Sequence, residues 1–280
     1  MKVFICANFH KEKSREVLSE SVGRLISLGI TPILPLVLKE EFFHELAEYT
    51  GEGFPADCDA VLTIGGDGTI LKWGKRAALL GKPLLGINTG RLGFMTALET
   101  DELERLSALK NGNYRLSRRM LLELTTAAGK QLLALNDVVL SRRLTAKLPE
   151  FCVKINEIEL SRIRADGLIF STPTGSTAYA LSAGGPIIEP SVECVEMTLL
   201  CAHTLWNRPM IFSGNDVITV SFGGNGAEEV DVCTDGDGGI FLREGESLTI
   251  RKADVDLRLI DIENNGFYSA VNRKLIQPIK

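Results

Sequence analysis

The chain has 280 residues, of which 45% are hydrophobic and 24% are charged, and its formal net charge is −5. That length suits two domains of ordinary size, and the acidic balance argues against a nucleic-acid-binding protein, which would usually carry a basic face. No apolar stretch approaches the roughly 18 residues of a membrane span, so we expect a cytoplasmic protein with no membrane partner. The six cysteines and three histidines lack zinc-site spacing, so we expect reduced, mostly buried thiols and no metal held by the protein alone.

The first part of the chain, residues 1–98, alternates between apolar runs and amphipathic segments. Short apolar runs predict strands at 3–6, 32–36, 60–64 and 84–87. One face of a helix is predicted by apolar residues at spacings of three and four: Leu18, Val22, Leu25 and Leu28. Further helices fit residues 39–49 and 69–80. This alternation indicates a Rossmann-like α/β domain with a mainly parallel sheet.

The pattern changes after one more predicted helix, near residues 101–111, which ends at Gly112. Phe151, Val153 and Ile155 alternate with polar residues, as in a strand with one buried face. Later strands are expected at 217–222, 229–233, 239–242, 247–251 and 255–262, and only residues 176–183 look helical. We therefore place an α/β domain at 1–100, a β-rich domain at 101–262, and a segment at 263–280 that packs back on the first domain.

The turn Gly65-Gly66-Asp67-Gly68 lies between a predicted strand and a predicted helix. In a parallel sheet, ligands bind outside the carboxyl ends of the strands. Glycines leave backbone N–H groups bare for a phosphate chain, and Asp67 places a carboxylate at the centre of the turn. An isolated Asp-Gly often only bonds its own backbone, but this glycine-rich setting favours a phosphate site with Asp67 as an acid–base group. No Walker-type lysine follows, so the turn is not a P-loop.

A second candidate segment covers residues 164–186, where a strand leads into a turn rich in hydroxyl groups. Six hydroxyl residues occur within twelve positions: Ser171, Thr172, Thr174, Ser176, Thr177 and Ser182. Some would serve as ordinary helix caps. Their number exceeds what one cap needs, which favours an anion or ribose site at the start of the helix. The absence of a Gly-x-Ser-x-Gly motif disfavours a serine hydrolase.

Two further polar strings are ambiguous. Asn136-Asp137 lies within the apolar run 135–140 and is either a strand-end turn or a ligand for ribose hydroxyls or an adenine amino group. The acidic, glycine-rich segment 233–239 is either a hairpin tip or a backbone that approaches a ligand closely.

Taken together, these strings resemble the NAD kinase family. Gly65-Gly66-Asp67-Gly68-Thr69 resembles its first signature, and Asn88-Thr89-Gly90-Arg91-Leu92-Gly93-Phe94 resembles its second. Matching strings then follow in the family's order: Asn136-Asp137, Asp166-Gly167-Leu168, residues 172–179, residues 182–186, His203-Thr204-Leu205, Arg208-Pro209 and Arg273-Lys274-Leu275. Other kinases share the Gly-Gly-Asp-Gly turn, whereas Pro-Thr-Gly-Ser-Thr-Ala-Tyr is far more specific.

The resemblance implies phosphoryl transfer from ATP to the 2′-hydroxyl of the adenosine ribose of NAD, giving NADP. It implies that Asp67 accepts the hydroxyl proton, beside a turn built by Gly65, Gly66 and Gly68. It assigns dinucleotide binding to Asn136, Asp137, Lys147, Arg164, Asp166, Thr177, Ala178, Tyr179, Ala180, Leu181 and Ser182. It also implies that a divalent metal, Mg²⁺, enters with ATP, and that the protein forms a homodimer or homotetramer. Whether polyphosphate replaces ATP stays open.

The sequence departs modestly from the family pattern. Asp137 stands where glutamate is commoner, which shortens the reach of the carboxylate by one methylene. Asp237 stands where many members carry glutamine, so a cofactor contact at that position is in doubt. The alternatives are a lipid or sugar kinase that shares the Gly-Gly-Asp-Gly turn, and a non-catalytic NADP sensor with the same fold.

Overall fold

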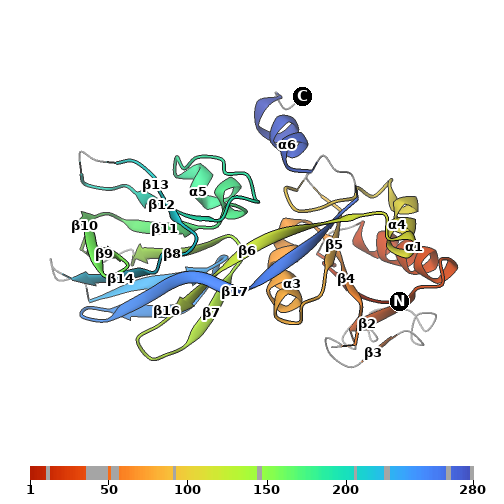
Figure 1. Ribbon diagram of the computed structural model, residues 1–280, viewed down its shortest axis with the longest axis horizontal. Coiled ribbons are helices and arrows are strands. Elements are labelled where there is room, and N and C mark those ends of the chain that lie inside the picture. Colours follow the sequence, from red (N-terminus) through yellow and green to blue (C-terminus); the bar gives the residue numbers. More distant parts are fainter. Residues whose placement is uncertain are drawn as a thin grey trace. The chain divides into compact units, whose positions relative to one another are not determined.

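The computed structural model describes residues 1–10, 13–35, 50–51, 57–90, 93–143, 147–204, 207–223, 228–262 and 266–277 (Figure 1). The chain divides into two compact units. Unit 1 comprises Met1–Arg118 and Leu257–Lys280, and unit 2 comprises Arg119–Asp256. The helix predicted at 39–49 lies outside the described residues. Among the described residues, no helix has the length and apolar character needed to cross a membrane.

Unit 1 contains a parallel sheet in the order β3-β2-β1-β4-β5, with the end of β17 beside β5. Its strands are β1 (Lys2–Ala7), β2 (Thr31–Pro35), β3 (Thr50–Gly51), β4 (Ala60–Gly65), β5 (Leu84–Asn88) and the last part of β17 (Ser247–Asp261). The apolar runs of the sequence form these strands because both faces of the sheet are covered. The prediction of an α/β fold with a mainly parallel sheet is confirmed.

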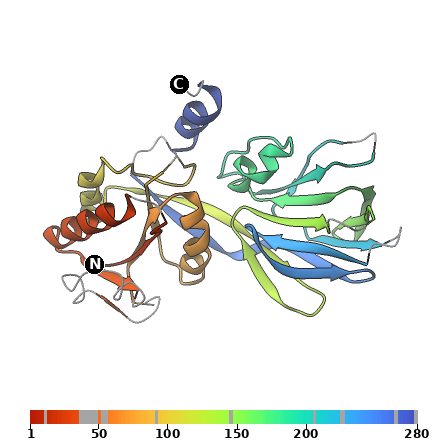
Figure 2. The same cartoon turned by 180° about the vertical axis from the view of Figure 1, so that it is seen from behind.

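Helices cover both faces of this sheet. Alternate residues of β1 point in opposite directions, so Val3 and Ile5 join the buried cluster that includes Leu18 of α1 (Ser14–Ser27). Phe4 points the other way, and its ring lies 6.0 Å from the ring of Trp73 in α3 (Asp67–Leu79). Figures 1 and 2 show these two helices on opposite sides of the strands.

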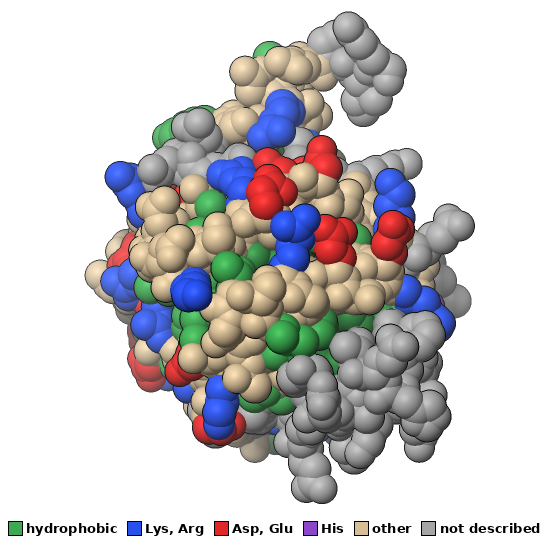
Figure 3. Space-filling model, turned by 90° about the vertical axis from the view of Figure 1, so that its right-hand side faces the viewer, with side chains coloured by type: hydrophobic (Ala, Val, Ile, Leu, Met, Phe, Trp, Pro, Cys, Tyr) green, Lys and Arg blue, Asp and Glu red, His purple; other side chains and the backbone are tan. Residues whose placement is uncertain are grey.

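The described residues of unit 1 also form four shorter helical segments. The helix predicted near residues 101–111 is divided into a 3₁₀ turn, η2 (Leu103–Leu106), and a short helix, α4 (Ser107–Asn111). Gly112 ends it in the left-handed region, with φ 66°. Near the C-terminus, α6 (Gly266–Val271) continues into a π-helical turn, η4 (Asn272–Ile276). Among the described residues on the face shown in Figure 3, basic and acidic side chains lie interspersed.

Unit 2 is built from strands in two sheets. The first sheet has the order β10-β9-β14-β17, and the second has the order β13-β12-β11-β8-β15-β16. The bounds are β8 (Asp137–Arg142), β9 (Glu150–Ile155), β10 (Ile158–Arg164), β11 (Gly167–Ser171), β12 (Cys194–Leu200), β13 (Met210–Ser213), β14 (Ile218–Gly223), β15 (Glu229–Thr234) and β16 (Asp237–Arg243). β6 (Arg115–Thr125) and β7 (Gln131–Ala134) form an antiparallel hairpin beside them.

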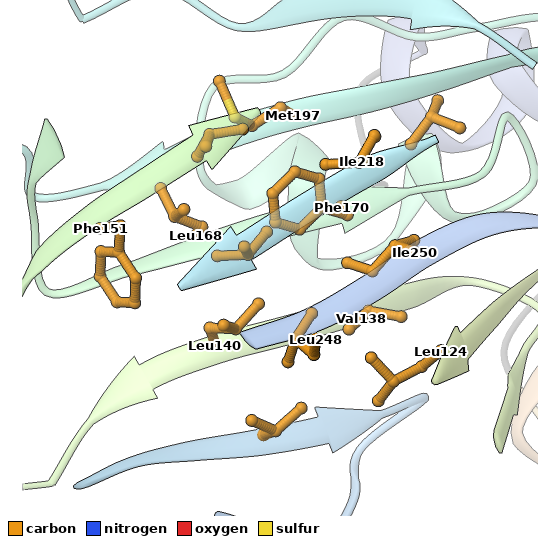
Figure 4. Close-up of a cluster of buried hydrophobic side chains, with 14 of the residues drawn as sticks. Leu124, Val138, Leu140, Phe151, Leu168, Phe170, Met197, Ile218, Leu248 and Ile250 are labelled. Atoms are coloured by element: carbon orange, nitrogen blue, oxygen red, sulfur yellow. The ribbon is translucent and has the colours of Figure 1, made fainter. Parts of the chain in front are cut away.

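The core of unit 2 lies between these sheets. Figure 4 shows side chains from both sheets pointing toward one another, among them Leu140, Phe170 and Met197 of the second sheet and Phe151 and Ile250 of the first. The predicted alternation of Phe151 and Val153 with polar residues is confirmed, since both side chains are fully buried. The β-rich character of this part of the chain is therefore confirmed as well.

The sequence-based prediction was wrong in one detail of this sheet. Two strands were expected at 247–251 and 255–262, but β17 runs without interruption from Ser247 to Asp261. The apparent break contains Ala253, which is only 4% exposed, so the strand continues through a small buried residue rather than a turn.

Candidate functional site

Asp67 is the first residue of α3 and follows directly on the carboxyl end of β4. Its Oδ2 accepts the backbone N–H of Phe94 at 2.8 Å, and its Oδ1 accepts that of Met95 at 3.1 Å. The turn that donates these bonds begins at the end of β5, where Asn88 pairs with Gly65 of β4. The two glycine-containing turns predicted at strand ends therefore meet, and the second one holds the carboxylate of the first.

Two glycines make this contact sterically possible. A Cβ on Gly93 would overlap Oδ1 of Asp67, and a Cβ on Gly65 would overlap Oγ1 of Thr69. Gly66 and Gly68 contribute differently, because they leave the backbone at the start of α3 partly or fully exposed. A bare helix N-terminus next to a fixed carboxylate suits a phosphate that must react beside a proton acceptor. Sequence reasoning named Asp67 but missed the N–H groups of Phe94 and Met95.

A cavity of about 90 Å³ adjoins the same turn. Its lining includes Gly93 and Phe94, three carboxylates and one guanidinium, and the charged side chains are Glu99, Glu102, Asp261 and Arg273. Burial raises the pKa of the Glu99 carboxyl, although a hydrogen bond from Asn88 opposes the change. An excess of carboxylates repels a polyphosphate chain, so the lining of this cavity does not suit a phosphate.

In unit 2, Asn136 and Asp137 lie where β8 begins and its two neighbouring strands, β11 and β15, end. Asp137 begins β8 and pairs with Ser171, the last residue of β11, while its neighbour Val138 pairs with Thr234 at the end of β15. The next residue, Asp235, accepts the backbone N–H groups of Leu135, Asn136 and Asp137 at 2.9, 2.7 and 3.3 Å.

Asp235 and Gly236 form the tip of the β15–β16 hairpin, with φ 53° and 82°. Positive φ at both central residues is the two-residue turn that hairpins prefer, and Asp-Gly is its usual sequence. The hairpin interpretation of residues 233–239 therefore holds. Sequence reasoning did not foresee that the Asp235 carboxylate would fix the start of β8.

The side chains of Asn136 and Asp137 are buried but incompletely satisfied. Asn136 is 9% exposed, and its Oδ1 has no hydrogen-bond partner among the described residues. Asp137 is 6% exposed; burial, and then the charge of Asp235, raises the pKa of its carboxyl to about 7. Buried polar groups normally have partners, so the unpaired Asn136 Oδ1 beside a buried carboxyl makes this pair a candidate for ligand binding.

Most of the hydroxyl groups in the turn after β11 form hydrogen bonds within the protein. Thr172 Oγ1 donates to the carbonyl of Leu135 at 2.6 Å and accepts the N–H of Gly175 at 3.0 Å. Backbone carbonyls also accept the hydroxyls of three other residues: Ser171, Ser176 and Thr177. All four hydroxyl groups therefore donate to backbone carbonyls, and neither of the two short helical segments that follow has a side-chain cap. The turn anchors residues 177–182 to the start of β8.

The segment Thr177–Ser182 follows as the end of a 3₁₀ turn (Gly175–Thr177) and the short helix α5 (Tyr179–Ser182). Tyr179 is 47% exposed and Ser182 is exposed, whereas Ala180 is fully buried. Tyr179 and Ser182 are therefore accessible to a ligand, while the Ala180 side chain serves packing. Ala178 and Leu181 are intermediate in exposure.

Two of the other predicted dinucleotide residues, Arg164 and Asp166, lie at the opposite end of β11. Asp166 precedes this strand and accepts a hydrogen bond from Arg142 Nε at 2.6 Å, while Arg164 Nε lies 3.2 Å from Glu150. Because Gly167 pairs with Ser141 and Ser171 with Asp137, four residue steps, roughly 13 Å, separate this end of the strand from Asp137. Lys147 is exposed. Within one chain, the predicted dinucleotide residues thus form two groups.

Comparison with known families gives a match for each of the two parts of the chain. Residues 5–114 match the family model described as ATP-NAD kinase N-terminal domain, and residues 135–262 match the one described as ATP-NAD kinase C-terminal domain. The chain belongs to the NAD kinase family. The activity of this family is phosphoryl transfer to an alcohol group of NAD, and nothing in these matches supports a lipid or sugar kinase.

Individual relatives agree with the assignment to the family. The NAD kinase of Moorella thermoacetica is 36% identical over 284 residues, covering 98% of this chain and 89% of that protein. The NAD kinase of Geotalea daltonii is 33% identical over 281 residues, covering 98% of each. Among solved structures, an NAD kinase from Archaeoglobus fulgidus in complex with ATP superposes with a TM-score of 0.75 at 26% identity, covering 97% of this chain and 99% of that one.

A further solved structure, yeast NADH kinase complexed with NADH, superposes with a TM-score of 0.87 and covers 100% of this chain and 89% of that one. Its sequence identity is 24%, so this likeness concerns the fold alone.

Proposed function

We propose that Asp67 is the proton acceptor in the transfer of a phosphoryl group from ATP to the 2′-hydroxyl of the adenosine ribose of NAD, which yields NADP. The observation that carries this assignment is the position of Asp67. Asp67 begins α3, directly after the glycine pair that follows β4. The backbone N–H groups of Phe94 and Met95 fix its carboxylate at this exposed helix N-terminus.

The chemistry follows from the relative acidities of the groups. A ribose hydroxyl holds its proton far more tightly than a carboxylic acid, so Asp67 does not remove that proton in advance. It orients the hydroxyl and takes the proton while the oxygen–phosphorus bond forms and the bond to the leaving ADP breaks. Because the transition state of phosphoryl transfer is loose, positioning and charge neutralisation account for most of the catalysis.

The divalent metal is a separate part of this proposal. Among the described residues, no group of three or more His, Cys, Asp or Glu side chains is arranged to hold a metal ion. Mg²⁺ typically keeps several waters and binds substrate phosphates with one or two carboxylates. We therefore expect ATP to bring Mg²⁺ with it, where it would neutralise charge on the transferring phosphate.

Asn136 and Asp137 are proposed to bind the dinucleotide. The unpaired Oδ1 of Asn136 accepts a hydrogen bond from an amino or hydroxyl group. The Asp137 carboxyl, with a pKa of about 7, also accepts hydroxyl groups when ionised. Tyr179 and Ser182 are exposed on the adjoining helix and extend the surface available to this ligand.

We propose that a second copy of the chain contributes Lys147, Arg164 and Asp166 to the dinucleotide site. Arg164 and Asp166 are separated from Asp137 by the length of β11, so one copy does not gather all of these residues around one ligand. In a homodimer or homotetramer, the distant residues of one copy would lie beside Asp137 of another copy. Mixing a D67N chain with a D166N chain tests this: partial recovery of activity is expected if the two groups come from different copies.

The compartment is proposed to be the cytoplasm. All six cysteines are free thiols, and three of them, Cys6, Cys58 and Cys194, are buried. Free thiols are the usual state in reducing compartments. Imaging of a fluorescently tagged chain would test this assignment.

The decisive experiment is the Asp67→Asn variant. The amide keeps the size of the side chain but does not accept the proton, so NADP formation should fall by about 100-fold or more while NAD still binds. Retained turnover in this variant would remove Asp67 from the proposed role. Product analysis with NAD or NADH, against ATP or polyphosphate, defines the substrates.

A further inference from the structure

Lys274, in the last helical segment that the structure describes, lies beside the proposed reaction site without an assigned role. It belongs to η4, and its Nζ lies 4.1 Å from the centroid of the Phe94 ring. Phe94 is also the residue whose N–H holds Oδ2 of Asp67. Phe94 therefore contacts both groups: the Lys274 ammonium lies over its ring, and its backbone N–H donates to the Asp67 carboxylate. The two contacts join the N-terminal and C-terminal segments of unit 1.

The surroundings of this ammonium are unusual for a surface lysine. Lys274 is partly buried, and it forms no ion pair with any described residue. Burial lowers the pKa of its ammonium, while the negative charge of Asp67 opposes that change. Lys274 is therefore within electrostatic range of Asp67 without neutralising it, and part of its hydration shell has been replaced by an aromatic ring.

We propose that Lys274 binds the γ-phosphate of ATP next to Asp67; this deepens the proposed function and rests on it. A partly desolvated cation without a counterion favours an anionic ligand more strongly than a fully hydrated lysine does. The cavity that Phe94 also lines disfavours the same ligand, because three of its charged side chains are carboxylates.

The proposed contact completes the charge balance of the reaction. The acceptor oxygen forms its bond to the γ-phosphorus, its proton passes to Asp67, and the bond from this phosphorus to the bridging oxygen breaks with its electrons leaving on ADP. Lys274 keeps its proton throughout. It offsets negative charge on the phosphoryl oxygens, which would otherwise repel the Asp67 carboxylate.

The test compares a nucleotide that has a γ-phosphate with one that lacks it. Lys274→Met keeps an aliphatic stem over Phe94 and removes only the charge. Binding of AMP-PNP and of ADP to the full chain is measured by calorimetry with Mg²⁺ and without NAD. We expect AMP-PNP affinity to fall about 10-fold and ADP affinity to stay within about twofold. Equal losses for both nucleotides, or no loss for either, would overturn the proposal.

A matched control is available on α3. Lys72 is exposed and also lies over an aromatic ring, with its Nζ 5.9 Å from the Trp73 centroid. Lys72→Met makes the same chemical change five residues along α3 from Asp67 and should alter neither affinity. Lys274→Arg should restore part of the AMP-PNP affinity, and this recovery distinguishes charge from packing. If Lys274→Met does not fold, Lys274→Gln is measured in its place, against the same two nucleotides.

The outcomes also separate this proposal from the proposed function. The binding assay contains no NAD, so it reports on Lys274 whether or not the chain makes NADP. A wild-type chain that binds AMP-PNP more tightly than Lys274→Met does, but does not phosphorylate NAD, would overturn the function and leave the phosphate contact standing. A wild-type chain that makes NADP, paired with an unchanged AMP-PNP affinity in Lys274→Met, would overturn the contact alone.

Discussion

The backbone N–H of Phe94 donates to the carboxylate of Asp67 at 2.8 Å, across 27 residues of sequence. The residue before Phe94 has no side chain, and a Cβ at that position would overlap the same carboxylate. The orientation of Asp67 is therefore set by a second turn and not by its own helix.

The Gly93→Ala substitution should separate orientation from chemistry. The added methyl group displaces Asp67 Oδ1, although the side chain remains a carboxylate. A misplacement of about 1 Å can lower kcat by about 100-fold. Steady-state kinetics and a thermal melt would measure the effect. Gly23→Ala in α1 is the control, since nothing lies within 4 Å of its Cβ and activity should not change. Wild-type kcat in Gly93→Ala would contradict the proposed need for this orientation.

The buried carboxyl of Asp137 should make stability depend on pH. Its pKa is about 7 in the folded chain, against about 3.9 for an unperturbed aspartate, so the folded state holds an extra proton between these values. This contribution is complete below about pH 4 and is lost as the pH rises to about 7. Relative to wild type, Asp137→Asn should gain about 1–4 kcal/mol of unfolding free energy between pH 4 and pH 8.

Urea denaturation at several pH values would measure this gain. Asp254→Asn is the control, because the Asp254 side chain is 84% exposed and its removal should shift stability by a similar small amount at every pH. A difference between Asp137→Asn and wild type that does not vary with pH would contradict the assignment.

Asp235 should act on dinucleotide binding through the backbone of residues 135–137. Asp235→Ala leaves three N–H groups without their acceptor, so the start of β8 should lose its fixed position. We expect KM for NAD to rise about 10-fold or more and KM for ATP to stay within about twofold. Asp237→Asn, on the exposed side of the same hairpin, should change neither constant. Equal effects on both substrates would indicate general unfolding instead.

Thr172 should contribute mainly to stability. Thr172→Val keeps the shape of the side chain but removes a buried hydroxyl with two hydrogen bonds, which should lower the free energy of unfolding by about 1–3 kcal/mol. Denaturant titration would measure it. Thr219→Val, at a half-buried position of β14, should change stability by about 0.5 kcal/mol or less. If both variants behave alike, the turn does not depend on the Thr172 hydroxyl.

Much of the fold was predictable because the signals were local. Apolar runs gave the parallel strands of unit 1, and alternation at Phe151 and Val153 gave a half-buried strand. The position of Asp67 between a strand and a helix was predictable for the same reason, since its neighbours in sequence form the turn around it.

The remaining features depend on contacts that are distant in sequence. The separation of Asp166 from Asp137 follows from the antiparallel register of β8 and β11, which no spacing along the chain encodes. The hydroxyl groups of Thr172 and Ser176 look the same in sequence whether they bind a ligand or a carbonyl. Lys274 is adjacent to Phe94 only after the C-terminal segment has folded against the first part of the chain.

The discontinuity of unit 1 has a consequence for how the protein is made. Its sheet receives the end of β17, where Leu259 pairs with Leu84, from a strand that begins within unit 2. Domains generally begin to fold during synthesis, from the N-terminus onward. Asp67 therefore leaves the ribosome long before the last strand and the lysine of its own unit. The proposed phosphate site therefore stays incomplete during synthesis until the segment that carries Lys274 has been added.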